Sequence, residues 1–212
     1  MQLIDAAALR LAANSALLHA DDATLARALM SGEAHAPRVA WGRFSPMVRG
    51  MLRRTLGPEF DVDDVLQDVF LCLFQNVKNL REPGALRAFV MSITVRTVRH
   101  EIRRRRIRRW VGLGDDGEVP DLRVVSPDTD SREALVRFYR VLDKVGTRDR
   151  TAFVLYFIEG LDAASVALNL SVSVPTVRRC LARAWKRVVL LAGRDPALAG
   201  YVARLKARGE TE

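Results

Sequence analysis

Helical periodicity runs through almost the whole of this 212-residue chain, and it restricts the fold to one built from α-helices. In residues 61–74 the apolar side chains recur at i, i+3, i+4 and i+7 and form one stripe on a helix: Val62, Val65, Leu66, Val69, Phe70, Leu73 and Phe74. No segment shows the alternation of apolar and polar residues that indicates a half-buried β-strand. The sequence therefore predicts an all-α fold.

Composition and targeting signals narrow the class of protein. Apolar residues make up 49% of the chain and the formal net charge is +9, which indicates a folded protein with a polyanionic partner. Cys72 and Cys180 lie far apart and outside any Cys/His cluster, so no metal site is expected and a reducing compartment is favoured. No apolar run approaches the roughly 18 residues that span a bilayer, and the N-terminus lacks the basic start of a signal peptide. We therefore expect a cytoplasmic protein with no membrane insertion and no cofactor.

Two helices of opposite charge follow one another in the first half of the chain. The helix predicted from Asp61 carries an acidic set on its polar side: Asp61, Asp64, Gln67 and Asp68. The helix predicted at residues 85–110 ends in an arginine cluster: Arg96, Arg99, Arg103 to Arg106, Arg108 and Arg109. Carboxylates suit a basic protein surface and guanidinium groups suit phosphates, so this part is predicted to hold a protein and a nucleic acid together. The simpler alternatives are a solvated helix face and a segment that binds RNA or a membrane surface.

Composition also divides the chain into two predicted helical domains. Residues 1–20 are an N-terminal extension, with a helix expected at 3–18. In the first domain, residues 21–110, further helices are expected from Asp21 or Asp22 to Ser31 and from about Pro37 to Leu56, with a loop at 78–84. The remaining divisions are an acidic linker at 111–131, a second helical domain at 132–192 and a tail at 193–212.

The second domain contains a predicted helix-turn-helix. Asp162 can cap a short helix, and Ser171 to Ser173 make the turn. Ser173 is a suitable N-cap for the next helix, and Pro175 falls in its first turn, where a missing N–H costs little. We expect the buried face of that helix to be Val177, Leu181, Ala184 and Val188. The opposite face is basic, so the second helix is suited to the DNA major groove. A plain helical hairpin with a solvated basic face is the alternative.

Together the two halves resemble a bacterial RNA polymerase sigma factor of the extracytoplasmic-function group, in the sigma-70 family. The resemblance covers roughly residues 21–190, with region 2 in the segments DDATLARALMSGEA, FSPMVRGMLRRTLG, DVDDVLQDVFLCLF and LRAFVMSITVRTVRHEIRRRR and region 4 in Thr147 to Val188. It implies two small helical domains, a flexible linker and an initiation factor that catalyses nothing by itself. It also implies core RNA polymerase and promoter DNA as partners, an anti-sigma factor as a further candidate partner, and a monomer when free.

The resemblance assigns roles by position. The acidic set is implied to contact the coiled coil of the polymerase clamp. A minus-10 set, in the loop that captures a flipped base and on the following helix, comprises Lys78, Asn79, Arg81, Phe89, Arg96, Arg99, His100, Arg103 and Arg104. A minus-35 set, in the helix-turn-helix, comprises Ser173, Thr176, Arg178, Arg179, Arg183 and Lys186.

Three positions depart from the family pattern. Phe89 stands where a tryptophan is common, Met91 where an aromatic is frequent, and Arg96 near a usual asparagine. Each ring on which an unpaired base stacks contributes ~1–3 kcal/mol. Fewer rings therefore predict weak promoter melting.

Three other functions are alternatives to this one. A stand-alone helix-turn-helix regulator would be expected to dimerise on a palindrome, and the chain has no obvious heptad seam for a dimer. A degenerate sigma-like protein would keep partner binding and lose promoter opening. A site-specific recombinase needs a nucleophilic Ser or Tyr in a catalytic arginine constellation, and no parallel-sheet pattern is present to carry one.

Overall fold

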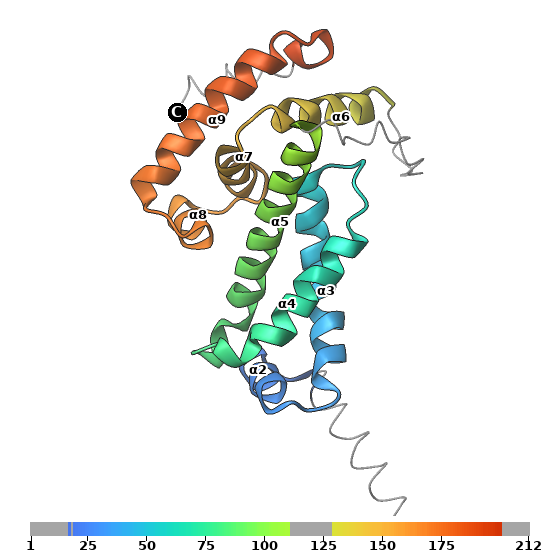
Figure 1. Ribbon diagram of the computed structural model, residues 1–212, viewed down its shortest axis with the longest axis vertical. Helices are drawn as coiled ribbons and strands as arrows, with labels where there is room; N and C mark the ends of the chain where they lie inside the picture. The colour runs from blue at the N-terminus through green and yellow to red at the C-terminus, as the bar shows by residue number, and fades with distance from the viewer. Residues whose placement is uncertain (1–16, 18, 111–128, 201–212) are drawn as a thin grey trace, which may run out of the picture. The chain divides into compact units, whose positions relative to one another are not determined.

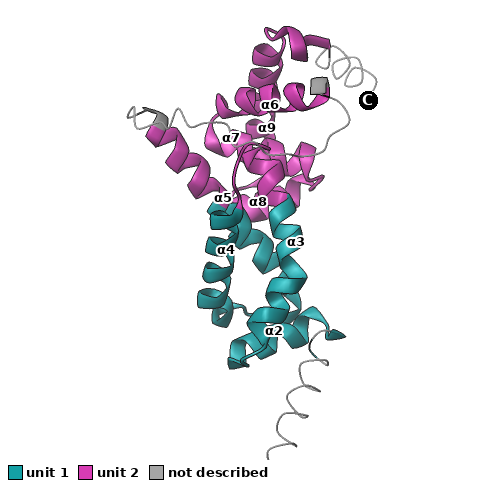
Figure 2. Ribbon diagram, turned by 90° about the vertical axis from the view of Figure 1, so that its right-hand side faces the viewer, with its two compact units in different colours: residues 1–50, 63–97 teal, residues 51–62, 98–212 magenta. Residues whose placement is uncertain are grey.

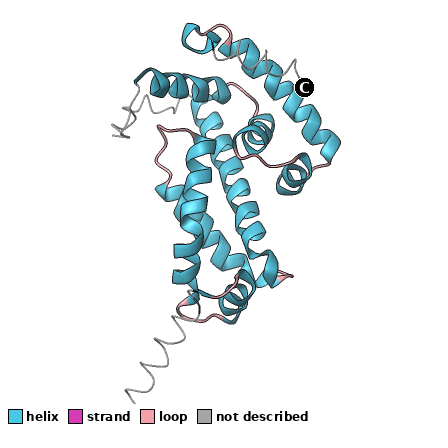
Figure 3. Ribbon diagram, turned by 180° about the vertical axis from the view of Figure 1, so that it is seen from behind, coloured by secondary structure: helices cyan, strands magenta, loops and turns pink. Residues whose placement is uncertain are grey.

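The structure is a computed structural model that describes residue 17, residues 19–110 and residues 129–200. Every regular element in these ranges is helical, and none of the described residues forms a β-strand (Figure 1, Figure 3). The predicted all-α fold is therefore confirmed. Most of the expected helix at 3–18, most of the linker and the last twelve residues of the tail lie outside the described residues.

The chain forms two compact units (Figure 2). One comprises Met1–Gly50 with Asp63–Thr97, and the other comprises Met51–Val62 with Val98–Glu212. Two of the boundaries fall inside long helices, one in α3 (Ala36–Leu56) and one near the middle of α5 (Leu86–Trp110), so each of these helices contributes to both units. The domain boundaries predicted from composition stay a prediction, because the two compact units are defined by contacts in the structure and not by sequence.

The first unit packs α2 (Asp22–Ser31), most of α3, α4 (Asp63–Asn76) and the first half of α5 around one apolar core (Figure 1). Asp21 begins α2 by accepting a hydrogen bond from the Thr24 N–H at 2.8 Å, which satisfies a donor that the helix itself cannot pair. Seven of the largest buried side chains fill this core: Leu25, Phe44, Leu66, Phe70, Leu73, Leu86 and Ile93. The predicted apolar stripe is buried except for Phe74, which is half-buried.

Two boundaries in this part differ from expectation. Helix α4 begins at Asp63 and not at Asp61, with Asp63 and Asp64 in its first turn, where carboxylates favour the positive end of the helix dipole. Two short 3₁₀ turns overlap the ends of the loop predicted at 78–84, η1 (Val77–Asn79) and η2 (Pro83–Ala85). The buried side chains of Val77 and Leu80 anchor this segment to the core, which sequence periodicity over so few residues could not reveal.

The second unit contains α6 (Thr129–Asp143), α7 (Thr147–Phe153), a π-helical turn η3 (Val154–Ile158), α8 (Ala163–Leu170) and α9 (Val174–Ala192). Helix α6 begins at Thr129, two residues before the expected end of the linker at residue 131. The apolar core of the second unit includes Leu142, Phe153, Val154, Ala184 and Val188. These residues bring α6 and α7 against the inner face of α9 and thereby hold α9 in place.

A buried arginine joins three segments of the second unit. Arg150 on α7 is 3% exposed, pairs with Asp143 and donates a hydrogen bond to the Thr55 carbonyl at 3.0 Å. That carbonyl lies in the last turn of α3, where the helix offers no partner of its own. Arg150 therefore supplies a hydrogen-bond donor to a carbonyl at the end of α3. Most arginines in proteins are exposed, so the sequence gives no sign of this buried role.

Candidate functional site

The acidic set lies on solvent-exposed positions. Asp64, Gln67 and Asp68 follow one another at i, i+3 and i+4 on α4, so they share one face of that helix. Leu71 continues the same face and is 58% exposed, which is unusual for a leucine on a helix with a well-filled core side. Asp61 is exposed as well but precedes the helix. The three helical members therefore form one acidic surface with an apolar residue at its edge.

Asp63 was not assigned to the acidic set, and the structure shows that it is engaged within the chain. Its carboxylate forms an ion pair with Arg49 of α3. This pair distinguishes the two acidic residues of the first turn of α4. Asp63 ties the helix to its neighbour, and Asp64 remains on the outward face.

The first members of the minus-10 set lie where α4 gives way to η1. Lys78, Asn79 and Arg81 are exposed, while the chain between them is held by buried Leu80. Further along, Phe89 is half-buried on α5 and Arg96 is exposed. An anchored backbone with outward cationic and amide groups is suited to a phosphate or an unpaired base.

The arginine cluster on α5 is partly neutralised by a residue that sequence reasoning missed. Glu101 is 5% exposed, and its carboxylate forms ion pairs with the Nε atoms of Arg104 at 2.9 Å and Arg105 at 3.4 Å. The guanidinium group of Arg105 also lies 3.7 Å from the ring centroid of Phe60. Arg104 and Arg105 follow Glu101 by three and four residues, and this spacing on a helix is the sequence signal that could have predicted the ion pairs.

The other basic residues of this helix differ in exposure. Arg103 and Arg106 are exposed and have no ion-pair partner among the described residues. Arg99 is half-buried, with Nη1 3.5 Å from the Leu170 carbonyl oxygen, and His100 is exposed. The strongest cationic positions for phosphate are thus Arg103 and Arg106, and the second of these was not in the minus-10 set.

The helix-turn-helix is formed by α8 and α9. Asp162 caps α8 by accepting from the Ser165 N–H at 2.6 Å, as predicted. Ser171 ends that helix in the left-handed conformation, with φ 54°, and its N–H and that of Val172 return to the carbonyls of the last turn. Pro175 lies in the first turn of α9, also as predicted.

Two details of α9 differ from expectation. Ser173 occupies the N-cap position, but its hydroxyl makes no capping hydrogen bond; it shares a 2.9 Å hydrogen bond with the hydroxyl of Thr176. Cys180 is fully buried, whereas Leu181 is only half-buried, because the buried face of α9 turns toward α7 at that point. Burial raises the pKa of the Cys180 thiol, so this side chain acts as a small apolar core residue.

Three members of the minus-35 set are linked at the start of α9. The Arg179 Nη2 donates to the Thr176 hydroxyl at 3.1 Å, and Thr176 shares its other hydrogen bond with Ser173. The side chains of Arg178, Arg179 and Lys186 are exposed. A linked row of hydroxyl and guanidinium groups at the beginning of a recognition helix can contact base edges and phosphates.

Arg183, another member of the set, is bound to a carboxylate. Its Nε and Nη2 donate to the two oxygens of Asp149 on α7 at 2.9 and 2.7 Å. Burial alone would raise the pKa of the Asp149 carboxyl, but hydrogen bonds from Arg183 and Cys180 outweigh it and the pKa is lowered. The same pair raises the pKa of Arg183. Sequence reasoning missed Asp149 because the two residues are 34 positions apart.

Neither a metal centre nor a membrane segment is visible in the described part of the chain. No group of three or more His, Cys, Asp or Glu side chains there could hold a metal ion. Within the same ranges, no helix combines the length and apolar character needed to cross a bilayer.

Comparison with known proteins finds two family regions along the chain, in the order that the sequence resemblance implies. Residues 41–108 match the model of Sigma-70 region 2, and residues 135–188 match that of Sigma-70, region 4. The chain is 27% identical over 158 residues to the ferric citrate uptake sigma factor FecI of Escherichia coli K12, covering 71% of this chain and 87% of FecI. It is 28% identical over 151 residues to the RNA polymerase sigma factor CnrH of Cupriavidus metallidurans, covering 65% of this chain and 76% of CnrH.

Solved structures agree with these sequence matches. CnrH in complex with the cytosolic domain of CnrY is similar with a TM-score of 0.57 and 25% identity, over 82% of this chain and 98% of CnrH. The sigma factor RpoE of Bartonella quintana, in complex with the anti-sigma factor NepR, is similar in fold with a TM-score of 0.52 and 18% identity, over 74% of this chain and 97% of RpoE.

Proposed function

Because the chain belongs to the extracytoplasmic-function group of the sigma-70 family, we propose that it is an initiation factor that binds core RNA polymerase and directs it to one class of promoters. The observation that carries this proposal is the presence of both family regions, in order, each with an exposed surface of the required charge. Sigma factors are non-catalytic initiation factors. We extend this to the present chain, which recognises DNA while the polymerase makes phosphodiester bonds.

The polymerase contact in this proposal is the exposed acidic face of α4. Asp64, Gln67 and Asp68 offer two carboxylates and an amide at helical spacing, and Leu71 adds an apolar contact beside them. A basic groove or coiled coil on the polymerase complements such a face. Asp61 lies just before the helix and is proposed as an accessory contact.

The DNA contacts are proposed for the two basic surfaces. Lys78, Asn79 and Arg81, followed by Phe89 and the exposed basic residues of α5, are proposed to capture the minus-10 element. The start of α9 is proposed to read the minus-35 element through its hydroxyl and guanidinium groups, with Lys186 on phosphate. In this proposal Arg183 contributes less to affinity than Arg178 or Arg179, because Asp149 already neutralises its charge.

Two further proposals concern the setting of the protein. An anti-sigma factor is a proposed partner, since CnrH is seen with the cytosolic domain of CnrY and RpoE with NepR. The cytoplasm is the proposed location, because bacterial polymerase and promoter DNA are found there. A stand-alone regulator is favoured by none of these observations.

A reconstituted transcription assay tests the proposal. Purified protein is mixed with bacterial core RNA polymerase and genomic fragments, and both complex formation and promoter-specific transcripts are scored. We expect a stable complex and transcripts that begin at a limited set of sites. Binding to DNA without any binding to core polymerase would refute the initiation-factor assignment and support the regulator.

A charge-reversal pair isolates the polymerase contact. Asp64→Lys with Asp68→Lys should abolish complex formation, because both carboxylates are exposed and on one face of α4. The matched control is Glu33→Lys with Glu82→Lys, which makes the same change of charge at exposed positions elsewhere in the chain. Equal polymerase affinity in the two variants would remove the docking assignment while leaving promoter recognition open to its own test.

A further inference from the structure

The exposed side of α5 carries a row of basic residues. Arg96, His100 and Arg103 follow one another at i, i+4 and i+7, so they lie on one face of the helix, and all three are exposed. Arg103 has no ion-pair partner among the described residues. Arg104 is the next residue and is also exposed, so sequence spacing alone assigns both arginines to the same contact with DNA.

Glu101 distinguishes Arg104 from that row. Its carboxylate lies 2.9 Å from the Nε of Arg104, and its side chain is only 7% exposed. If Arg104 moved to a phosphate, Glu101 would keep only Arg105, whose Nε is more distant at 3.4 Å. A buried charge that loses its partner costs much more free energy than a solvated one. We therefore expect the ion pair between Glu101 and Arg104 to persist when α5 approaches DNA.

Arg105 is held by a second interaction. Its guanidinium group lies 3.7 Å from the ring centroid of Phe60, in the segment between α3 and α4. This cation–π contact does not depend on the carboxylate of Glu101. Loss of that carboxylate would therefore release Arg104 and leave Arg105 over the ring.

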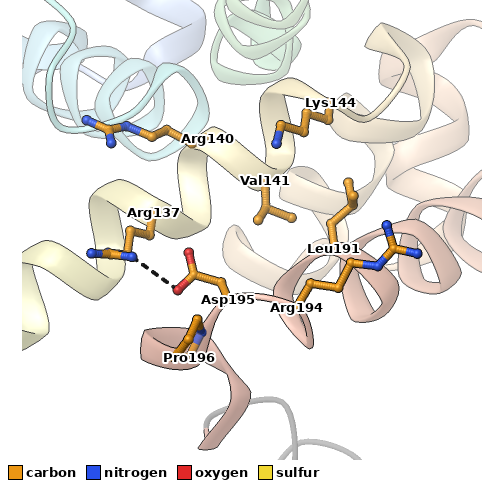
Figure 4. A pocket seen from close by; sticks show the side chains of 8 residues that line it. All are labelled: Arg137, Arg140, Val141, Lys144, Leu191, Arg194, Asp195 and Pro196. Atoms are coloured by element: carbon orange, nitrogen blue, oxygen red, sulfur yellow. Dashed lines mark hydrogen bonds and ion pairs between the residues drawn. The ribbon is translucent and has the colours of Figure 1, made fainter.

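The basic residues around the end of α9 are arranged differently. The side chains of Arg140 on α6 and Arg194 just after α9 point to opposite sides (Figure 4). Arg140 also lies 3.9 Å from Glu59, and Arg137 pairs with Asp195 at 3.3 Å. These cations share no common face, so they form no row that could follow a DNA backbone. The exposed row on α5 is the better candidate for phosphate.

We propose that Glu101 is a positioning residue that determines which arginines of α5 meet phosphate: Arg103 is left available, and Arg104 is held back. This role rests on the proposed contact between α5 and promoter DNA. Phosphate contacts carry no sequence information, so each further arginine on the backbone raises the affinity for all DNA alike. By holding Arg104, Glu101 limits this sequence-independent affinity and thereby increases the preference for promoters over other DNA.

The salt dependence of binding to a labelled duplex of arbitrary sequence tests this role, by fluorescence anisotropy with the full chain. One phosphate contact contributes about 0.9 to the magnitude of the slope of log affinity against log salt concentration. Arg103→Gln should lower that magnitude by about 0.9, whereas Arg104→Gln should leave it unchanged. Both variants remove one positive charge at adjacent exposed positions, so net charge cannot account for a difference between them.

Removal of the carboxylate should have the opposite effect. Glu101→Gln should raise the magnitude of the slope by about 0.9, because Arg104 becomes available to phosphate. Addition of Arg104→Gln to that variant should return the slope to the wild-type value, so the two substitutions are not additive. The matched control is Glu33→Gln, which removes one carboxylate at an exposed position and should leave the slope unchanged. Circular dichroism checks that each variant keeps its helical content.

Three results would overturn the role of Glu101. Arg104→Gln could lower the slope as much as Arg103→Gln does, which would leave the proposed DNA contact of α5 intact. Glu101→Gln could change the slope no more than Glu33→Gln does, with the same consequence. Finally, the slope could be the same in every α5 variant; α5 then meets no phosphate, and the proposed DNA contact is refuted together with the role of Glu101. Binding to core polymerase is tested separately from all three.

Discussion

The ion pair between Arg183 and Asp149 leads to a specific prediction about DNA binding. Both guanidinium donors of Arg183 that face Asp149 are occupied, at 2.9 and 2.7 Å. If the pair persists on DNA, Arg183 neutralises no phosphate and releases no counterion. Arg183→Gln should then leave the salt dependence of DNA binding unchanged. Arg179→Gln should reduce it, because Arg179 hydrogen-bonds only a hydroxyl among the described residues.

The expected magnitude follows from counterion release. One phosphate contact contributes about 0.9 to the slope of log affinity against log salt concentration. Between about 50 and 200 mM salt, a fourfold change, one contact therefore changes affinity by about 3.5-fold. Arg179→Gln should lower the slope by about 0.9, and Asp149→Asn should raise it by the same amount, since it releases the charge of Arg183.

Fluorescence anisotropy with one labelled duplex and the full chain measures these slopes across the salt range. Circular dichroism of each variant checks that the helix-turn-helix is intact. The reasoning is refuted if Arg183→Gln lowers the slope as much as Arg179→Gln does. That result would mean that Arg183 exchanges Asp149 for phosphate when DNA binds.

Three further predictions concern stability. Gly57→Ala should lower the free energy of unfolding by at least about 1 kcal/mol, because φ at Gly57 is 109° and a Cβ would lie 3.2 Å from the Tyr139 ring. Gly42→Ala should raise the free energy of unfolding by about 0.5–1 kcal/mol, because Gly42 lies inside α3 with open space around its Cβ position. Urea unfolding measures both changes. Leu142→Ala should cost about 2–5 kcal/mol at a fully buried site, whereas Leu168→Ala, at a side chain 78% exposed, should stay within about 0.5 kcal/mol by the same measurement; equal losses would contradict the burial assigned to Leu142. The lowered pKa of Asp149 contributes stability that is present above its unfolded pKa of about 4 and lost as pH falls through the lower folded pKa, so the melting temperature of Asp149→Asn should depend less on pH between about 5 and 2.

Long periodic segments could be predicted from the sequence, and short or distant features could not. The expected helix from about Pro37 to Leu56 agrees closely with α3, because a stripe of apolar residues over several turns has one helical solution. The π-helical turn at Val154–Ile158 has no such signal: it depends on how five residues pack between α7 and α8. It was therefore absent from the sequence-based description.

Among candidate functional residues, the sequence was informative about type and weak about pairing. It correctly placed Arg178 and Arg179 on the exposed side of α9, since their spacing from Val177 and Ala184 determines the face they occupy. It could not show that Asp149 binds Arg183, because the two residues are 34 positions apart in the sequence and meet only in the folded domain. Whether these exposed residues contact DNA stays a prediction.

By itself, the sequence determined the helical class, the faces of the long helices and the family, because each follows from residue spacing along the chain. Only the tertiary structure decided which charges remain available. Asp63 and Asp64 are adjacent in sequence, but Arg49 pairs with the first. Ion pairing depends on distances of a few ångströms between side chains from different helices, and such distances exist only after those helices have packed.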